Sequence, residues 1–186
     1  MRGREVELTM YSNVPHHSSE LARLATSRLP APRVAKRLAI DAIMSGTAAS
    51  LASAAALMAG SKIRDGSWAG GLNGPSQWLW GESEAYTRQA TLRHTALGYA
   101  IHHSTSIFWA LLYEAIFDSR KKKPALQHCT QAVAGAATAY VVDYHMTPRR
   151  LRPGFEKHVS PTGMVVVYAA FAAGLAIAGI LRDRYR

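Results

Sequence analysis

The sequence predicts an all-α integral membrane protein, an up-down bundle of four helices with both termini in the cytoplasm. Hydrophobic residues make up 48% of the 186 residues, and charged residues make up only 18%. The apolar residues gather in four segments of about 20 residues, the length that a helix needs to cross a hydrocarbon core. Basic residues lie between these segments. The predicted spans are 38–60, 95–117, 125–145 and 161–181.

Each span is expected to be helical, because lipid offers no hydrogen-bond partners to an extended backbone. Asp41 is the only charge in the first span, and the fourth span has none. Alanine-rich segments such as the first and third spans would also suit a soluble helical protein. The fourth span argues against that alternative. A surface helix of a soluble protein has one polar face, and the segment from Met164 to Leu181 has none.

Lysine and arginine residues set the predicted orientation. The N-terminal tail, the connection between the second and third spans and the C-terminal end together carry 14 of them, whereas the other two connections carry 8. The positive-inside rule therefore places both termini in the cytoplasm. We expect a basic cytoplasmic tail over 1–37 and a transmembrane domain over 38–186, with a tryptophan-containing outer connection over 61–94.

The net charge of +10 would also suit a nucleic-acid-binding protein. The chain has no recognition motif for nucleic acid, however, and membrane topology already accounts for the charge. Cys129 is the only cysteine, which excludes a disulfide-stapled module, and it is expected to be a small buried residue. The expected partners are therefore the lipid bilayer and other helices, and no nucleic acid.

Small residues recur four positions apart in the spans. Helices in lipid approach each other closely where side chains are small. Such faces pack the chain's own helices, and they equally suit a second copy in a homo-oligomer or a partner in a larger membrane complex. The pairs are Gly46/Ser50, Ala49/Ser53, Ala56/Gly60, Ala132/Ala136, Gly135/Ala139, Ala169/Ala173 and Gly174/Ala178.

Ionisable residues within the spans are candidate functional groups, since charge is costly in lipid. Asp41 and Glu114 fall near the predicted cytoplasmic surface, where ion pairing is the simplest interpretation. Histidine and aspartate residues nearer the outer side could hold a transition metal, or a haem between two helices. The competing interpretation is hydrogen bonding between helices, because no HExxH or CxxC motif is present. The metal-ligand candidates are His103, His145, Asp143, His94 and His102.

The outer connection is long for a link and contains the stretch GGLNGPSQWLWG over 70–81. Glycine and proline favour turns in it, and tryptophan is enriched at the boundary between membrane and water. We expect an interfacial or re-entrant segment that caps the helices, or a simple tryptophan anchor. Its candidate residues are Asn73, Ser76, Trp78 and Trp80.

A wider pattern includes this stretch. The run LNGPSQWLWG at 72–81 is followed by LRHT at 92–95, by His102–His103 and by FWA at 108–110. The pattern resembles a group of small four-span proteins of the bacterial inner membrane that have no established activity. The likeness covers 46–114, with PRRL at 148–151 and PGFE at 153–156 in addition. It implies a bacterial inner membrane and four helices, and it implies no catalytic residue.

Three functions are compatible with these features. The leading one is a small polytopic inner-membrane protein without catalytic activity or cofactor, which acts through helix contacts as a scaffold, an accessory subunit or in envelope maintenance. The alternative is a redox protein that binds a transition metal or haem at the His/Asp candidates. The third is a transporter of small solutes or one coupled to protons, in which Asp41 and Glu114 would take part. The chain has no catalytic triad order, nucleophile elbow or phosphate loop, so an enzyme is not expected.

Overall fold

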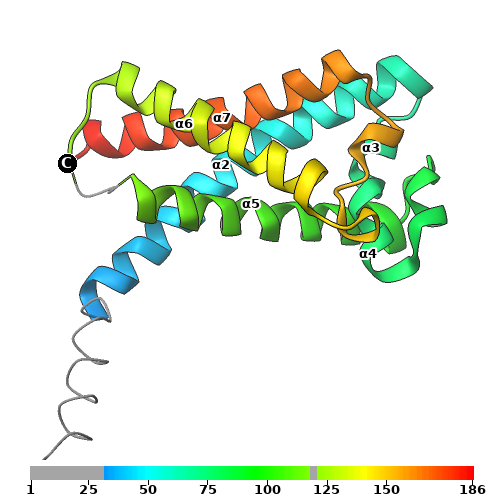
Figure 1. Ribbon diagram of the computed structural model, residues 1–186, viewed down its shortest axis with the longest axis horizontal. Helices are drawn as coiled ribbons and strands as arrows, with labels where there is room; N and C mark the ends of the chain where they lie inside the picture. The colour runs from blue at the N-terminus through cyan, green and yellow to red at the C-terminus, as the bar shows by residue number, and fades with distance from the viewer. Residues whose placement is uncertain (1–31, 118–120) are drawn as a thin grey trace, which may run out of the picture. The chain divides into compact units, whose positions relative to one another are not determined.

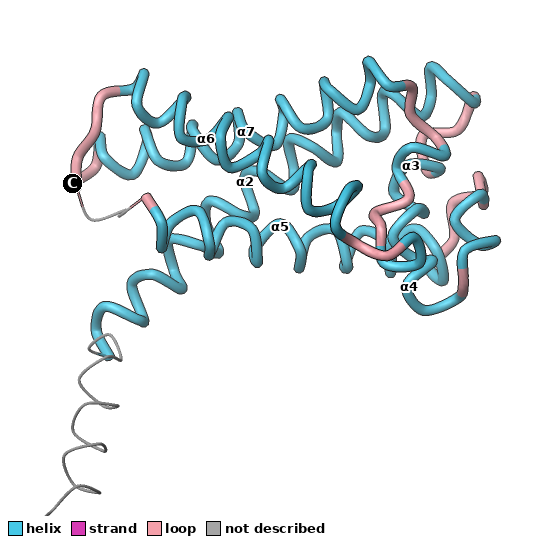
Figure 2. The backbone as a smooth tube through the Cα atoms, in the orientation of Figure 1, coloured by secondary structure: helices cyan, strands magenta, loops and turns pink. Residues whose placement is uncertain are grey.

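The computed structural model describes residues 32–117 and 121–186, and within them every regular element is a helix (Figure 2). The predicted all-α class is confirmed for this part of the chain. The chain divides into two compact units, 1–36 and 37–186. Most of the predicted basic tail, residues 1–31, lies outside the described residues.

Four long helices coincide with the four predicted spans. A turn of π-helix, η3 (Leu92–Ala96), leads into the second of them, and another, η4 (Val142–Met146), extends the third. Ser160 caps the fourth by accepting a hydrogen bond from the Gly163 N–H at 3.1 Å, and Pro161 occupies the first helical position, where its missing N–H costs nothing. The long helices are α2 (Pro32–Asp65), α5 (Leu97–Ile116), α6 (Ala125–Val141) and α7 (Pro161–Arg184).

Two of the described helices, α2 and α7, are long and apolar enough to cross a membrane. Length and composition alone are weak support, because the core helix of a soluble protein meets the same criteria. Helix α6 is shorter, with 17 residues before η4 begins.

Small residues bring the helices of the second unit into close contact. A Cβ atom added to Gly46 of α2 would lie 2.6 Å from the Ile107 Cα of α5. A Cβ added to Gly174 of α7 would lie 2.4 Å from the Ala49 Cα of α2. Both distances are shorter than real Cβ contacts, so only glycine fits. Two of the predicted small-residue pairs, those that begin at Gly46 and Gly174, thus serve packing within the chain.

The short segments between the long helices fold over one end of α5 (Figure 1). We call residues 66–96 and 147–160 the cap. The connection between α2 and α5 is thus a series of short helical elements packed on α5 rather than an open loop. The elements of the cap are α3 (Gly70–Asn73), η1 (Gly74–Ser76), α4 (Gln77–Trp80), η2 (Glu82–Tyr86), η3, η5 (Arg149–Leu151) and η6 (Phe155–Lys157).

Glycine allows the two cap segments to touch. Gly154 has a positive φ of 77°, which disfavours other residues. A Cβ at Gly154 would also lie 2.9 Å from the Gly74 carbonyl oxygen. A Cβ at Gly98, at the start of α5, would lie 2.0 Å from the Leu72 carbonyl oxygen, so α3 rests directly on the α5 backbone. The backbone of the cap therefore packs directly against the backbone of α5.

The long helices bury polar side chains beside an apolar core, and they leave many large apolar side chains exposed. The buried polar residues come from α2, α5 and α6, and include Asp41, Ser45, Ser50, Ser53, His102, Ser106, Glu114 and His128. Large apolar side chains on all four helices are at least one-third exposed, among them Ile40, Ile43, Met44, Leu51, Phe108, Leu111, Ile116, Leu126, Val133, Val165, Val166 and Ile177. Cys129, expected to be buried, is also exposed, because α6 turns its other face, with His128 and Ala132, toward the interior.

Candidate functional site

The first candidate cluster joins three helices at the end of the second unit that contains the C-terminus. Arg182 of α7 donates from Nη1 to Glu114 Oε1 at 2.8 Å and from Nη2 to Glu114 Oε2 at 3.0 Å. The Glu114 side chain is 1% exposed and that of Arg182 9%. Ser45 of α2 also donates to Glu114 Oε1, at 2.5 Å. A bidentate ion pair of this kind fixes the planes of the guanidinium and carboxylate groups relative to each other.

Asp41 joins the same cluster, with Oδ2 3.3 Å from Arg186 Nη2 and Oδ1 3.8 Å from Arg182 Nη1. The two candidate carboxylates thus share Arg182. We call Asp41, Ser45, Glu114, Arg182 and Arg186 the Arg182 network. Both carboxylates are buried and ion-paired, and the partners that the structure gives them are Arg182 and Arg186. Asp41 and Glu114 are candidates from the sequence, whereas Arg182 was considered there only as one of the basic residues that set the predicted orientation.

A second, smaller pairing lies beside it. His128 of α6 lies with Nε2 2.8 Å from Asp183 Oδ2, which also accepts the Lys123 N–H at 2.9 Å. This ties the start of α6 to the end of α7. Gly179 leaves room for the ring, since a Cβ there would lie 2.5 Å from His128 Nδ1. The basic connection before α6 and the C-terminal residues are therefore neighbours.

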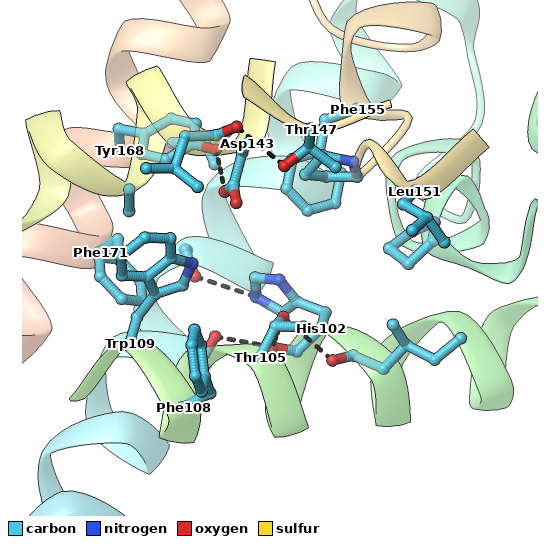
Figure 3. Close-up of a pocket in the computed structure, with 18 of the residues that line it drawn as sticks. His102, Thr105, Phe108, Trp109, Asp143, Thr147, Leu151, Phe155, Tyr168 and Phe171 are labelled. Atoms are coloured by element: carbon cyan, nitrogen blue, oxygen red, sulfur yellow. Dashed lines mark hydrogen bonds between the residues drawn. The ribbon is translucent and has the colours of Figure 1, made fainter. Parts of the chain in front are cut away.

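The second candidate site is a cavity of about 260 Å³ between α5, α6 with η4, and α7, closed on one side by the cap. His102 of α5 and Asp143 of η4 face this space from opposite walls (Figure 3). The walls are largely apolar and rich in aromatic residues. The aromatic lining residues are Trp78, Phe108, Trp109, Phe155, Tyr168 and Phe171.

Both polar walls of the cavity are anchored by hydrogen bonds to a neighbouring helix. Tyr168 of α7 donates its hydroxyl proton to Asp143 Oδ2 at 2.8 Å. His102 lies with Nε2 3.0 Å from Ser53 Oγ of α2. Ser53 in turn donates to the Ala49 carbonyl at 2.7 Å. Because a serine has a single hydroxyl hydrogen, the Ser53 oxygen accepts from His102, and the neutral ring then keeps Nδ1 as an acceptor.

The five metal-ligand candidates do not meet at one point. His102 and Asp143 line the cavity, whereas His94 belongs to the cap, with Nε2 2.9 Å from Glu84 Oε2 and Nδ1 3.0 Å from Thr91 Oγ1. Among residues 32–117 and 121–186, no three His, Cys, Asp or Glu side chains lie close enough together to hold a metal ion.

The other two histidines have only ring contacts among their described neighbours. The His103 ring lies 5.8 Å from that of Tyr99, and its buried Nδ1 has no hydrogen-bond partner. The exposed His145 ring lies 5.8 Å from that of Tyr140. The metal or haem alternative stays a prediction that rests on residue type, and elemental analysis with a visible absorption spectrum of the purified protein tests it.

Three of the four candidates in the connection 61–94 hold the cap together through hydrogen bonds, whereas the buried Ser76 hydroxyl has no hydrogen-bond partner among the described residues. Asn73 donates from Nδ2 to the carbonyls of Thr87 and Gln89 at 2.7 and 3.0 Å and accepts from Thr95 at 2.7 Å. Ser76 is fully buried. Trp78 Nε1 donates to the Arg152 carbonyl at 3.2 Å, and Trp80 Nε1 to the Arg93 carbonyl at 3.1 Å. Of the four, only Trp78 also lines the cavity.

His158 is a central cap residue that is not among the five metal-ligand candidates. The buried ring lies with Nδ1 2.5 Å from Asp65 Oδ2 and Nε2 2.7 Å from the Ala85 carbonyl. Both partners are acceptors, so a protonated ring donates to both. No local motif indicates this pairing, because His158 and Asp65 are 93 residues apart.

The Asp65 carboxyl lies beyond the apolar span 38–60, and its environment shifts its titration. Burial alone would raise its pKa. The hydrogen bonds from His158 and from the Ser67 N–H, with the positive charges of His158 and Arg88, outweigh burial and lower the pKa below its ordinary 3.8. The folded structure therefore favours the carboxylate form of Asp65, which joins the end of α2 to the cap.

Comparison with known proteins adds no identification: no protein family, no curated protein and no solved structure matches the chain. The resemblance to small four-span membrane proteins stays a prediction from the sequence pattern.

Proposed function

We propose that the chain is an integral protein of the bacterial inner membrane with four spans and both termini in the cytoplasm. In this proposal it has no catalytic activity and acts through helix contacts with itself or with a partner in the membrane. Helices α2, α5, α6 with η4, and α7 supply the four spans.

The observation that carries the proposal is that the long helices, beside their apolar core, leave large apolar side chains exposed and bury ionisable ones. A soluble protein would bury Ile43, Leu51, Phe108 and Val165 and leave carboxylates in water, because burial of apolar area is its main source of stability. Here these side chains are 52–69% exposed, whereas Glu114 is 2% exposed. Lipid removes the cost of exposed apolar groups and makes interior pairing of ionisable groups necessary.

The position of the basic residues supports the orientation. Lys123 and Asp183 are in contact, so the lysine-rich connection before α6 and the arginine-rich end of α7 lie at the same end of the second unit. The cap lies at the other end of α5 (Figure 1). Under the positive-inside rule the lysine-rich end faces the cytoplasm and the cap faces outward.

One predicted small-residue pair remains for contacts outside the chain. Ala169 and Ala173 lie one turn apart on α7 and are exposed, in contrast to Gly174, which packs on Ala49. Small exposed residues with this spacing let another helix approach closely in lipid. We therefore place the contact with a second copy or a partner on this face of α7.

Cysteine labelling tests the topology. In a Cys129→Ser background, Ser83→Cys in the cap and Lys122→Cys before α6 each present one exposed thiol. A membrane-impermeant maleimide added to spheroplasts is expected to label the first and to label the second only after permeabilisation. Labelling of the second in intact spheroplasts, or of neither after permeabilisation, would overturn the proposed orientation.

Cross-linking tests the contact. In the same Cys129→Ser background, Ala173→Cys on α7 and Ala137→Cys on α6 are matched exposed positions on two different helices. Oxidation in native membranes is expected to give a disulfide-linked species, to a second copy or to a partner, from the α7 variant and none from the α6 variant. Equal yields, or no product from either, would contradict a contact on α7.

A further inference from the structure

We infer that the cavity between α5, α6 with η4, and α7 binds a lipophilic organic cation, a molecule with a positively charged nitrogen centre and an aromatic or aliphatic body. The inference concerns a ligand site and does not depend on the helix contact proposed above. It rests on the charge of the cavity, on its aromatic walls and on its opening.

The charge of the cavity has one sign. Asp143 is the only acidic residue in its wall, and among the described residues that line it there is no lysine or arginine. Tyr168 donates to Oδ2 at 2.8 Å, and the Trp109 side chain also hydrogen-bonds the carboxyl group. A carboxylate has about four acceptor positions, so two donors hold it in place and leave acceptor capacity for a ligand.

The opposite polar wall adds no competing donor. The His102 ring donates its Nε2 hydrogen to Ser53, as the hydrogen bond from Ser53 to Ala49 requires. Thr105 and Thr147, which also line the cavity, donate their hydroxyl hydrogens to backbone carbonyls of Ile101 and Val142 at 3.1 and 2.8 Å. These donors are engaged within the protein, so this wall offers no free donor to an anion.

Aromatic side chains form most of the remaining wall. Trp109, Phe108 and Phe171 lie together on one side of the cavity, and Phe155 lies toward the cap (Figure 3). The faces of aromatic rings attract cations, most strongly for tryptophan, and the attraction grows when water is excluded. A carboxylate surrounded by such rings is the chemistry that recognises a quaternary ammonium group or a protonated amine with an apolar body.

The cavity is accessible from outside. Phe108 and Leu151 line it and are themselves 53% and 45% exposed. The cavity wall therefore reaches the protein surface at Phe108 of α5 and Leu151 of η5, where we expect a ligand to enter. In a membrane this opening faces lipid, where lipophilic cations partition.

Calorimetry with a matched pair of ligands tests the inference. Phenyltrimethylammonium carries the charge, and tert-butylbenzene has the same shape with a neutral carbon in place of nitrogen. The detergent-purified full chain is expected to bind the cation saturably and to bind the neutral isostere at least about tenfold more weakly. Asp143→Asn keeps an acceptor for Tyr168 and should weaken cation binding about tenfold or more, and Trp109→Leu about fivefold.

Glu82→Gln is the matched control, since it removes one carboxylate that lies in the cap and outside the cavity wall. It should leave the affinity within about twofold of the native value. Far-UV circular dichroism and size-exclusion chromatography show that each variant is folded. The inference is overturned if the cation does not bind saturably, if folded Asp143→Asn binds it as tightly as the native chain, or if the neutral isostere binds equally well.

Discussion

The two ends of the second unit are closed by different chemistry. At the C-terminal end, side chains pair with side chains: Arg182, Glu114 and Asp41 join three helices through ion pairs. At the cap, side chains mostly pair with backbone: Asn73, Trp78 and Trp80 all donate to carbonyl groups. The cap also has ion pairs, such as those of His94 with Glu84 and of His158 with Asp65 at the end of α2, but His158 reaches the Ala85 carbonyl as well.

The difference follows from backbone structure. A long helix satisfies its own N–H and C=O groups, so the polar side chains between two long helices must find one another. The cap consists of one-turn helices and turns, whose many carbonyls have no partner within the element. Side-chain donors are needed there to satisfy them. We therefore expect the C-terminal end to depend on few strong pairs and the cap on many weak ones.

Replacing Arg182 is expected to have the largest effect, and it tests whether charge pairing closes the C-terminal end. Arg182→Met leaves the Glu114 carboxylate buried without its main partner, and loss of one member of a buried ion pair costs about 3–5 kcal/mol. We expect the free energy of unfolding in detergent to fall by that amount, as measured by denaturant titration.

A double variant is the control. Arg182→Met combined with Glu114→Met removes both charges and should recover most of the loss, because no unpaired charge remains. A double variant as unstable as Arg182→Met alone would show that packing, and not charge pairing, closes this end.

His158→Phe tests the cap. The substitution keeps a ring of similar size and removes the donors to Asp65 and to the Ala85 carbonyl. A buried acceptor left without a donor costs about 1–3 kcal/mol. We therefore expect His158→Phe to make the cap less stable, and we expect to measure this as faster proteolysis and faster amide exchange within the cap. His145→Phe is the matched control, since His145 is exposed, and should change stability by less than about 0.5 kcal/mol. Equal effects of the two variants would contradict the role given to His158.

The smallest expected effect is on pH dependence, and it concerns the cap alone. The pKa of Asp65 is lowered from 3.8 in the folded chain, so its contribution to stability is complete above about pH 5 and is lost as pH falls through the folded value, below about pH 4. Amide exchange of the cap should accelerate over that window. In Asp65→Asn the cap should already be less stable at neutral pH and show a smaller acid-dependent change. An identical pH profile in both proteins would remove Asp65 as the cause.

Two residues of the cavity wall could be selected from the sequence. Asp143 and His102 were expected to converge near one end of the spans, and both line the cavity. Their partners Tyr168 and Ser53 were not selected, because a tyrosine and a serine in apolar spans give no local signal of pairing. His94 was grouped with them by residue type, yet η3 turns it toward Glu84 in the cap.

The sequence by itself determined the helices. An uninterrupted apolar run such as 161–181 has few other ways to satisfy its backbone, and local capping by Ser160 and Pro161 fixes where α7 begins. Such choices depend on neighbours within a few positions, so they can be predicted from the sequence alone.

Only the tertiary structure decided which polar groups meet. Arg182 and Glu114 are 68 residues apart, and Asp65 and His158 are 93 apart. Their contacts depend on the rotation of each helix about its axis and on close approaches at glycines such as Gly174. A rotation of one residue, about 100°, would turn Glu114 from Arg182 toward the outer face. That rotation is fixed by packing of the whole molecule, and no local pattern in the sequence records it.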